Sequence, residues 1–132
     1  MKPFATLVTL LVVFLLVAVP PADAQGSARG RVDPPRDPAM ELTAQHNLDI
    51  ARWYLTKRKA FDGARDRLQE IVDTYPEFSR MDEVTFLLGE VNLKLNKPEK
   101  ATEYYEKLVK DYSGSEFAKK ARERLDELKN KS

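Results

Sequence analysis

Residues that could catalyse a reaction or bind a metal are scarce in this 132-residue chain. There is no cysteine, which excludes a thiolate nucleophile, thiolate metal ligands and disulfide bonds. The single histidine, His46, has Asp49 three residues further along, and one such pair occurs commonly by chance and supplies too few metal ligands. No serine stands at a spacing that would pair it with His46 as nucleophile and base. We therefore expect no enzymatic activity, no bound metal and no cofactor.

Phosphate binding and charge-driven partners are also not indicated. The five glycines are scattered and form no phosphate-cradling loop. Charged residues make up 33% of the chain, but 22 basic residues nearly balance 21 acidic ones, and the formal net charge is +1. A balanced charge favours neither nucleic acid nor an acidic membrane. We expect no nucleic-acid partner and at most an indirect association with a membrane.

The first 24 residues have the pattern of an export signal. Lys2 is followed by an apolar run of 16 residues from Phe4 to Val19, and Ala22 and Ala24 provide the small-x-small pattern of a cleavage site. The alternative is an uncleaved anchor helix, but this run is shorter than the ~20 residues that span a bilayer. We expect cleavage after Ala24 and a location in the periplasm, where the protein could associate with the outer membrane.

Residues 25–37, QGSARGRVDPPRD, are predicted to be a flexible linker, because they contain glycine, proline and arginine without any apolar periodicity. From Asp37 onward the apolar residues recur at helical spacing, and Pro38 suits the first position of a helix. This all-α domain is expected to span residues 38–132. Its first helix runs from Pro38 to about Arg58, the second stops at Pro76, the third is capped by Ser79 and ends near Asn96, the fourth begins at Pro98, and the fifth is capped by Ser115.

The second half of this domain repeats the first. Ala64 and Ala101 are 37 residues apart, whereas Ala51 and Gly89 are 38 apart, so one turn differs by a residue. A fixed period in this range predicts an array of helical hairpins, each burying its apolar face against the next. We expect hairpins at about 38–76 and 79–112, and a helix at about 115–130 that caps the last apolar face.

The string LLGEVNLKLNKPEKATEYYEKLV resembles the tetratricopeptide repeat, with Gly89, Ala101 and Tyr105 at its signature positions. The string from Ile50 to Pro76 matches the same repeat with Ala51, Tyr54, Phe61, Ala64 and Leu68. The resemblance implies that small residues stand where the two helices of a hairpin approach closely.

A narrower resemblance concerns the segment HNLDIARWYLTKRKAF and the following RLQEIVDTYP. These strings look like the BamD family, the periplasmic repeat lipoproteins of the outer-membrane β-barrel assembly machinery. This chain would be a shortened relative without the lipidated cysteine. The resemblance implies an adaptor for a protein or peptide, with an outer-membrane assembly component as partner. The alternatives are an accessory protein of the Tol-Pal type and a self-associating structural envelope protein, for which a homo-oligomer is expected.

In the tetratricopeptide repeat family, ligands usually lie in a concave groove formed by the first helix of each hairpin. The resemblance therefore predicts an apolar strip in which Leu48 lies beside Phe86 and Leu55 beside Leu93, flanked by charges that fix the register of a peptide. The alternative is that these residues pack against neighbouring helices while Arg52 and Glu90 form a local ion pair. The candidate groove residues are Gln45, Leu48, Arg52, Leu55, Thr56, Glu83, Phe86, Glu90, Leu93 and Lys94.

Overall fold

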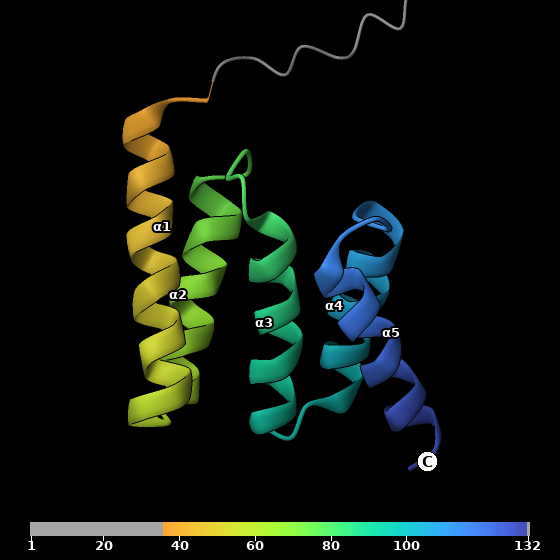
Figure 1. Cartoon of the computed structure of the whole chain (residues 1–132). Coiled ribbons are helices and arrows are strands. Elements are labelled where there is room, and N and C mark those ends of the chain that lie inside the picture. Colours follow the sequence, from red (N-terminus) through yellow and green to blue (C-terminus); the bar gives the residue numbers. More distant parts are fainter. Residues whose placement is uncertain (1–35, 132) are drawn as a thin grey trace, which may run out of the picture. The chain divides into compact units, whose positions relative to one another are not determined.

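The computed structural model describes residues 36–131, which belong to a compact unit spanning residues 33–132. The expected export signal and residues 25–35 of the linker lie outside the described residues. The described part contains helices and no strands (Figure 1), which confirms the expected all-α class. None of its helices is both long and apolar enough to cross a membrane.

Five α-helices follow one another along the described chain, with short turns between them. Consecutive helices contact each other, and α3 also contacts α5. The helices are α1 (Pro38–Trp53), continued by a π-helical turn (Tyr54–Arg58), then α2 (Phe61–Thr74), α3 (Met81–Lys94), α4 (Pro98–Asp111) and α5 (Glu116–Lys129).

The helices alternate in direction, which gives the bundle two ends (Figure 1). The end of the bundle that holds the start of α1 and the turns at residues 75–80 and 112–115 is called the upper end. The lower end holds the π turn, the turn at residues 95–97 and the end of α5.

Two of the expected helix caps are confirmed. The Asp37 carboxylate accepts a hydrogen bond of 2.9 Å from the backbone N–H of Ala39, and the Ser115 hydroxyl accepts one of 3.1 Å from the N–H of Phe117. Such side chains satisfy backbone donors that have no partner within the helix. Asn96 adopts the left-handed conformation with φ 55°, as expected for a residue that ends a helix.

The expected cap at Ser79 is wrong. Helix α3 begins at Met81, and Arg80 precedes it without a side-chain cap. The Ser79 backbone N–H donates instead to the Glu41 carboxylate of α1 at 3.2 Å, and its hydroxyl donates to the same carboxylate. Ser79 therefore ties the turn between the hairpins to α1, because the nearby acceptor on another helix competes with the local cap.

The π turn explains why the two repeat spacings differ by one residue. At the end of α3 the N–H of Lys97 donates to the carbonyl of Asn92, five residues earlier, whereas at the end of α1 the N–H of Ala60 donates to the carbonyl of Tyr54, six residues earlier. A π turn holds one more residue than an α-helical turn of similar length. The extra residue of the first hairpin is thus absorbed at Tyr54–Arg58, before α2 begins.

The core consists of two clusters that share α3. The first cluster fills the space between α1, α2 and the inner face of α3, and the second lies between α4 and α5 with partly buried residues of α3 against it. Burial of such side chains from water is the main stabilising contribution to a helical array. The largest fully buried side chains are Leu48, Leu68, Ile71, Val84, Leu88, Val91, Tyr105 and Leu108.

Small residues stand where the helices of each hairpin approach closely. Ala51 and Ala64 are fully buried in the first hairpin, and Ala101 is fully buried in the second. At Gly89 an added Cβ would lie 2.3 Å from Cε1 of Tyr105, which is closer than any two such atoms can stand. The glycine therefore makes room for the aromatic ring of α4 against α3.

Candidate functional site

A closed ring of polar side chains joins α1 to α3 on the face where the groove was expected. Arg52 Nε donates to Glu83 Oε1 at 2.8 Å, and Arg52 Nη1 donates to Asp49 Oδ1 at 2.9 Å. Arg80 also donates to Glu83, and its Nη1 donates to Gln45 Oε1 at 3.2 Å. Gln45 Nε2 closes the ring by donating to Asp49 at 3.0 Å. Glu83 is only 5% exposed, so its buried charge is balanced by the two guanidinium groups.

A second polar bridge joins α3 to α5. Arg124 donates to both oxygens of Glu90, through Nε at 2.8 Å and through Nη2 at 3.1 Å. The Tyr105 hydroxyl donates to Glu90 Oε1 at 2.6 Å. Burial, followed by this hydrogen bond and the Glu90 charge, raises the pKa of Tyr105 well above its usual range. Arg124 also pairs with Glu127, and its hydrogen bonds to the two carboxylates raise the pKa of its guanidinium.

The apolar strip expected along the groove does not form. Leu48 is 0% exposed and belongs to the first core cluster, so the expectation that it contacts a ligand is wrong. Phe86 packs on the second cluster instead, with its ring 5.9 Å from that of Tyr105. Leu55 is partly buried against the first cluster and Leu93 against the second. Leu48 and Phe86 thus pack on different core clusters and do not form the expected strip.

Four polar members of the predicted groove already bind partners within the fold. Gln45, Arg52 and Glu83 belong to the ring, and Glu90 pairs with Arg124 rather than with Arg52. The two remaining residues are exposed: the Thr56 hydroxyl donates to the Arg52 carbonyl at 2.8 Å, and Lys94 makes no ion pair within residues 36–131.

A shallow depression of about 280 Å³ remains on this face between α3 and α5. The sequence prediction missed the contribution of α5, although Arg124 follows Glu90 by 34 residues, close to the repeat period. That spacing would have placed α5 as a third helix beside the first two. The depression is lined by Phe86, Lys120, Glu123, Arg124 and Glu127.

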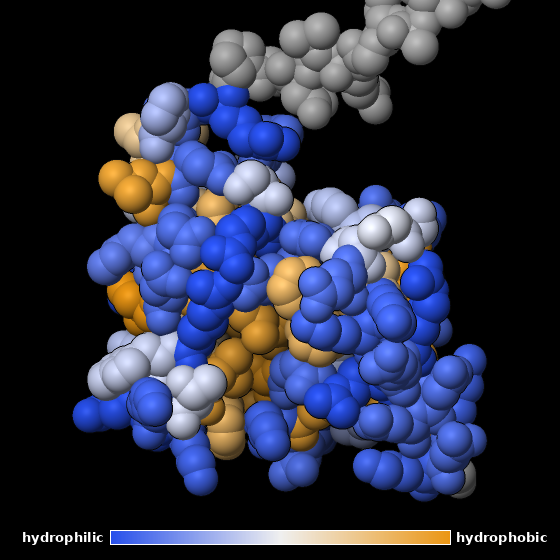
Figure 2. Space-filling model, viewed as in Figure 1, coloured by the Kyte–Doolittle hydropathy of each residue, from blue (hydrophilic) through white to orange (hydrophobic). Residues whose placement is uncertain are grey.

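Apolar side chains are visible in the middle of the face seen in Figure 2, among largely hydrophilic surroundings. A further hollow of the surface lies beside α3, between α2 and α4. The hollow there measures about 190 Å³, and Val72, Leu88 and Tyr104 contribute to its lining. Leu88 is almost fully buried, and the Tyr104 hydroxyl donates across the hollow to Gln69 of α2 at 3.4 Å. The hollow is therefore largely closed by the protein's own side chains.

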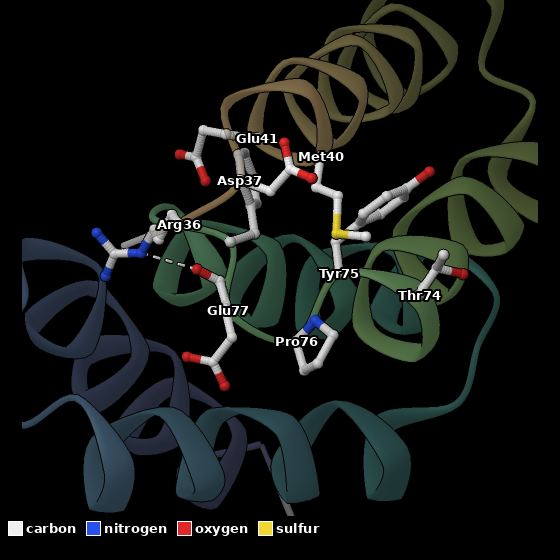
Figure 3. Close-up of a pocket in the computed structure, with 9 residues that line it drawn as sticks. Arg36, Asp37, Met40, Glu41, Thr74, Tyr75, Pro76 and Glu77 are labelled. Carbon is white, nitrogen blue, oxygen red and sulfur yellow. Dashed lines mark hydrogen bonds between the residues drawn. The ribbon is translucent and has the colours of Figure 1, made fainter. Parts of the chain in front are cut away.

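A cavity of about 240 Å³ lies at the upper end, between the first turn of α1 and the turn that follows α2 (Figure 3). We call it the turn cavity. Its apolar lining comes from Met40, Tyr75, Pro76 and Phe78, and Met40 is 56% exposed. The other lining residues are Arg36, Asp37, Glu41, Thr74 and Glu77.

Polar contacts hold the rim of the turn cavity in place. The guanidinium of Arg36 donates through Nε to the Glu77 carbonyl at 2.9 Å, the contact drawn in Figure 3. Glu41 is fixed by Ser79, and Asp37 caps α1. The rim around the apolar lining thus contains three carboxylates and one guanidinium group. In sequence this site was visible only as the break between two helices, because Met40 lies far along the chain from Tyr75.

No group of three or more histidine, cysteine or acidic side chains within residues 36–131 is arranged to hold a metal ion. The profile of the tetratricopeptide repeat family matches residues 83–115, which cover most of α3, all of α4 and the turn to α5. Neither a curated protein nor a solved structure matches the chain. The second hairpin of this chain is thus a tetratricopeptide repeat.

Proposed function

We propose that this protein is a protein-binding adaptor and that the turn cavity receives an apolar side chain of its partner. Tetratricopeptide repeats generally mediate protein–protein interactions, which supports a binding role over a catalytic one. We choose the turn cavity as the binding site because the apolar lining around Met40 is exposed. Apolar surface that stays accessible next to a cavity is typical of a partner site.

The turn cavity is a better candidate than the concave face because of what each side chain already contacts. Along α1 and α3 the polar side chains bond to one another, and leaving the buried Glu83 carboxylate without its arginine partners would cost about 3–5 kcal/mol. A ligand on that face would have to replace these contacts. The apolar residues of the turn cavity carry no such competing bonds.

The charged residues at the rim of the turn cavity indicate which kind of partner segment could bind there. Asp37, Glu41 and Glu77 surround the apolar lining with carboxylates. Charge complementarity favours partner segments in which a lysine or arginine stands next to the anchoring apolar residue. We therefore propose a peptide segment with an apolar anchor and adjacent basic residues as the ligand.

The proposal extends to the cell envelope. The export-signal pattern of residues 1–24 supports a periplasmic location, and the strings between Ile50 and Pro76 support a role in outer-membrane protein assembly like that of BamD. N-terminal sequencing of the mature protein tests the location, with Gln25 as the expected first residue. A chain that retains Met1 at its start would contradict export by cleavage.

Photo-crosslinking in cells tests the site. A photoreactive amino acid at Thr74, an exposed residue of the cavity lining, should capture the partner. Met40→Arg fills the cavity and reverses the preference for a basic segment, so we expect at least a fivefold lower yield. Leu42→Arg is the matched control, because Leu42 is 71% exposed on the same helix but does not line the cavity.

Circular dichroism of both variants verifies that their helicity is unchanged. An equal crosslinking yield for the Met40 variant and the natural chain would overturn the choice of site, and so would an equal loss in both variants. Capture of a β-barrel assembly component supports the BamD-like role. Capture of a peptidoglycan-associated complex supports the Tol-Pal type instead, and a crosslinked pair of identical chains supports self-association.

A further inference from the structure

The lower end of the bundle carries positive charge that the fold does not use. Seven lysines of this end are exposed, and none of them makes an ion pair or a side-chain hydrogen bond within residues 36–131. They come from three separate places, namely the π turn with its following residue, the turn between α3 and α4, and the end of α5. These residues are Lys57, Lys59, Lys94, Lys97, Lys100, Lys129 and Lys131.

The upper end carries charges of both signs, and most of its carboxylates are engaged. Asp37 caps α1, Glu41 binds Ser79, and Glu83 binds two arginines. The hydroxyl of Ser115 donates to Asp82. The upper-end carboxylates named here bind partners within the fold, whereas the lower-end lysines remain available to a partner outside it.

Helix dipoles do not account for the lysines. Cations stabilise a helix at its C-terminal turn, which fits Lys57, Lys94 and Lys129. Lys97 and Lys100, however, stand at the N-terminus of α4, where the dipole disfavours positive charge. These lysines carry a cost within the fold, which indicates a use outside it.

The only tryptophan of the chain lies near the same end. Trp53 is the last residue of α1 and is 47% exposed, and the guanidinium carbon of Arg58 stands 5.3 Å from the centre of its ring. An indole with basic neighbours is typical of the headgroup layer of a membrane, because the ring is apolar while its N–H can still bond to water.

We propose that the lower end docks on an anionic lipid surface. Lysines are flexible point charges, unlike the rigid fork of arginine that recognises a single carboxylate or phosphate. Point charges spread over three turns match an extended layer of phosphate groups better than one acidic side chain of a protein. This docking is separate from partner binding at the turn cavity, which lies at the upper end.

Vesicle binding of the compact unit, residues 33–132, tests the proposal. This unit contains all the described helices and both core clusters, and it excludes the apolar run of residues 4–19, which could itself enter a membrane. With vesicles of phosphatidylcholine containing about one-third phosphatidylglycerol, we expect cosedimentation at low salt and release at roughly 0.5 M salt. Trp53 emission should shift to shorter wavelength on binding.

A pair of matched variants locates the contact. Replacing Lys94, Lys97 and Lys100 by glutamine should lower the partition onto the vesicles at least tenfold. The control replaces Lys107, Lys110 and Lys119, which changes the net charge equally but lies toward the upper end. Its partition should stay within about twofold of the natural sequence, because these charges are far from the lipid surface.

Three results would overturn the proposal. The first is an absence of binding to the anionic vesicles, including the case in which soluble polyglutamate binds instead and points to an acidic protein. The second is an equal loss of binding in both triple variants, which would mean that only net charge matters. The third is vesicle binding that leaves the emission of Trp53 unchanged.

Discussion

A single aromatic side chain connects the packing of the second hairpin with its polar bridge to α5. The ring of Tyr105 is fully buried against Gly89, and its hydroxyl donates to Glu90, which in turn holds Arg124. The ring cannot shift aside without breaking that hydrogen bond. Tyr105 therefore fixes the distance between α3 and α4 as well as the orientation of α5.

We expect Gly89→Ala to lower the free energy of unfolding by about 1–3 kcal/mol, because the new methyl group would overlap the Tyr105 ring. The gain in helix propensity, about 1 kcal/mol, does not offset this overlap. Urea denaturation followed by circular dichroism measures the change. Gly114→Ala is the control, since no atom lies within 4 Å of its added Cβ. Equal stability of the natural protein and the Gly89 variant would contradict the tight contact.

The buried hydroxyl also makes stability depend on pH at alkaline values. Burial and the bond to Glu90 raise the pKa of Tyr105, so the native state keeps the phenolic proton after the unfolded chain, with a pKa of about 10, has lost it. The corresponding stabilisation is fully present below about pH 10 and is lost as the pH rises further.

Tyr105→Phe should therefore reduce the steepness with which the free energy of unfolding falls between about pH 10 and pH 12. Urea denaturation at a series of pH values measures this slope. Part of the slope should persist, because burial also raises the pKa of Tyr104 and Tyr112. A slope identical to that of the natural protein would show that Tyr105 does not titrate differently in the two states.

Helix boundaries were largely predictable because they depend on neighbouring residues. Asp37 with Pro38, Asn96, and Ser115 act through local backbone geometry, which the sequence carries directly. Ser79 could not be assigned in this way, since its partner Glu41 lies on another helix. The π turn was visible as a one-residue difference between two spacings, but its position required the backbone.

We expect the π turn to tolerate the loss of its extra residue. Deleting Thr56 should restore an ordinary α-helical ending and change the free energy of unfolding by no more than about 1 kcal/mol. Deleting Thr85, in the middle of α3, should unfold the second hairpin, because every later residue of α3 would rotate by about 100°. Thermal denaturation compares the two deletions. Equal destabilisation would show that the extra residue is needed where it stands.

The way in which charge is distributed over the whole molecule is not apparent from its net charge. A net charge of +1 argued against an acidic membrane, yet the fold gathers unpaired lysines at the lower end and engaged carboxylates at the upper end. The alternation of helix direction produces this separation. Helix boundaries alone could have revealed it, because residues 57–59, 94–100 and 129 all fall at one end of an antiparallel array.

The candidate groove was harder to predict because it depends on which helix faces which. Leu48 and Phe86 occupy comparable positions along α1 and α3 but pack on different core clusters. The pairing of Glu90 with Arg124 required α5 to lie beside α3. The turn cavity similarly combines residues about 35 positions apart, which periodicity within a helix cannot bring together.

The number of α-helices in the described part is odd, so α1 begins at the upper end and α5 finishes at the lower end (Figure 1). A mechanical pull between residue 36 and residue 131 would therefore run diagonally across the array, with a component along the helix axes that loads the hairpins in shear. Many packed side chains would then have to slide past one another at once. Without α5, both termini would lie at the same end, and the same pull would peel the helices apart one contact at a time.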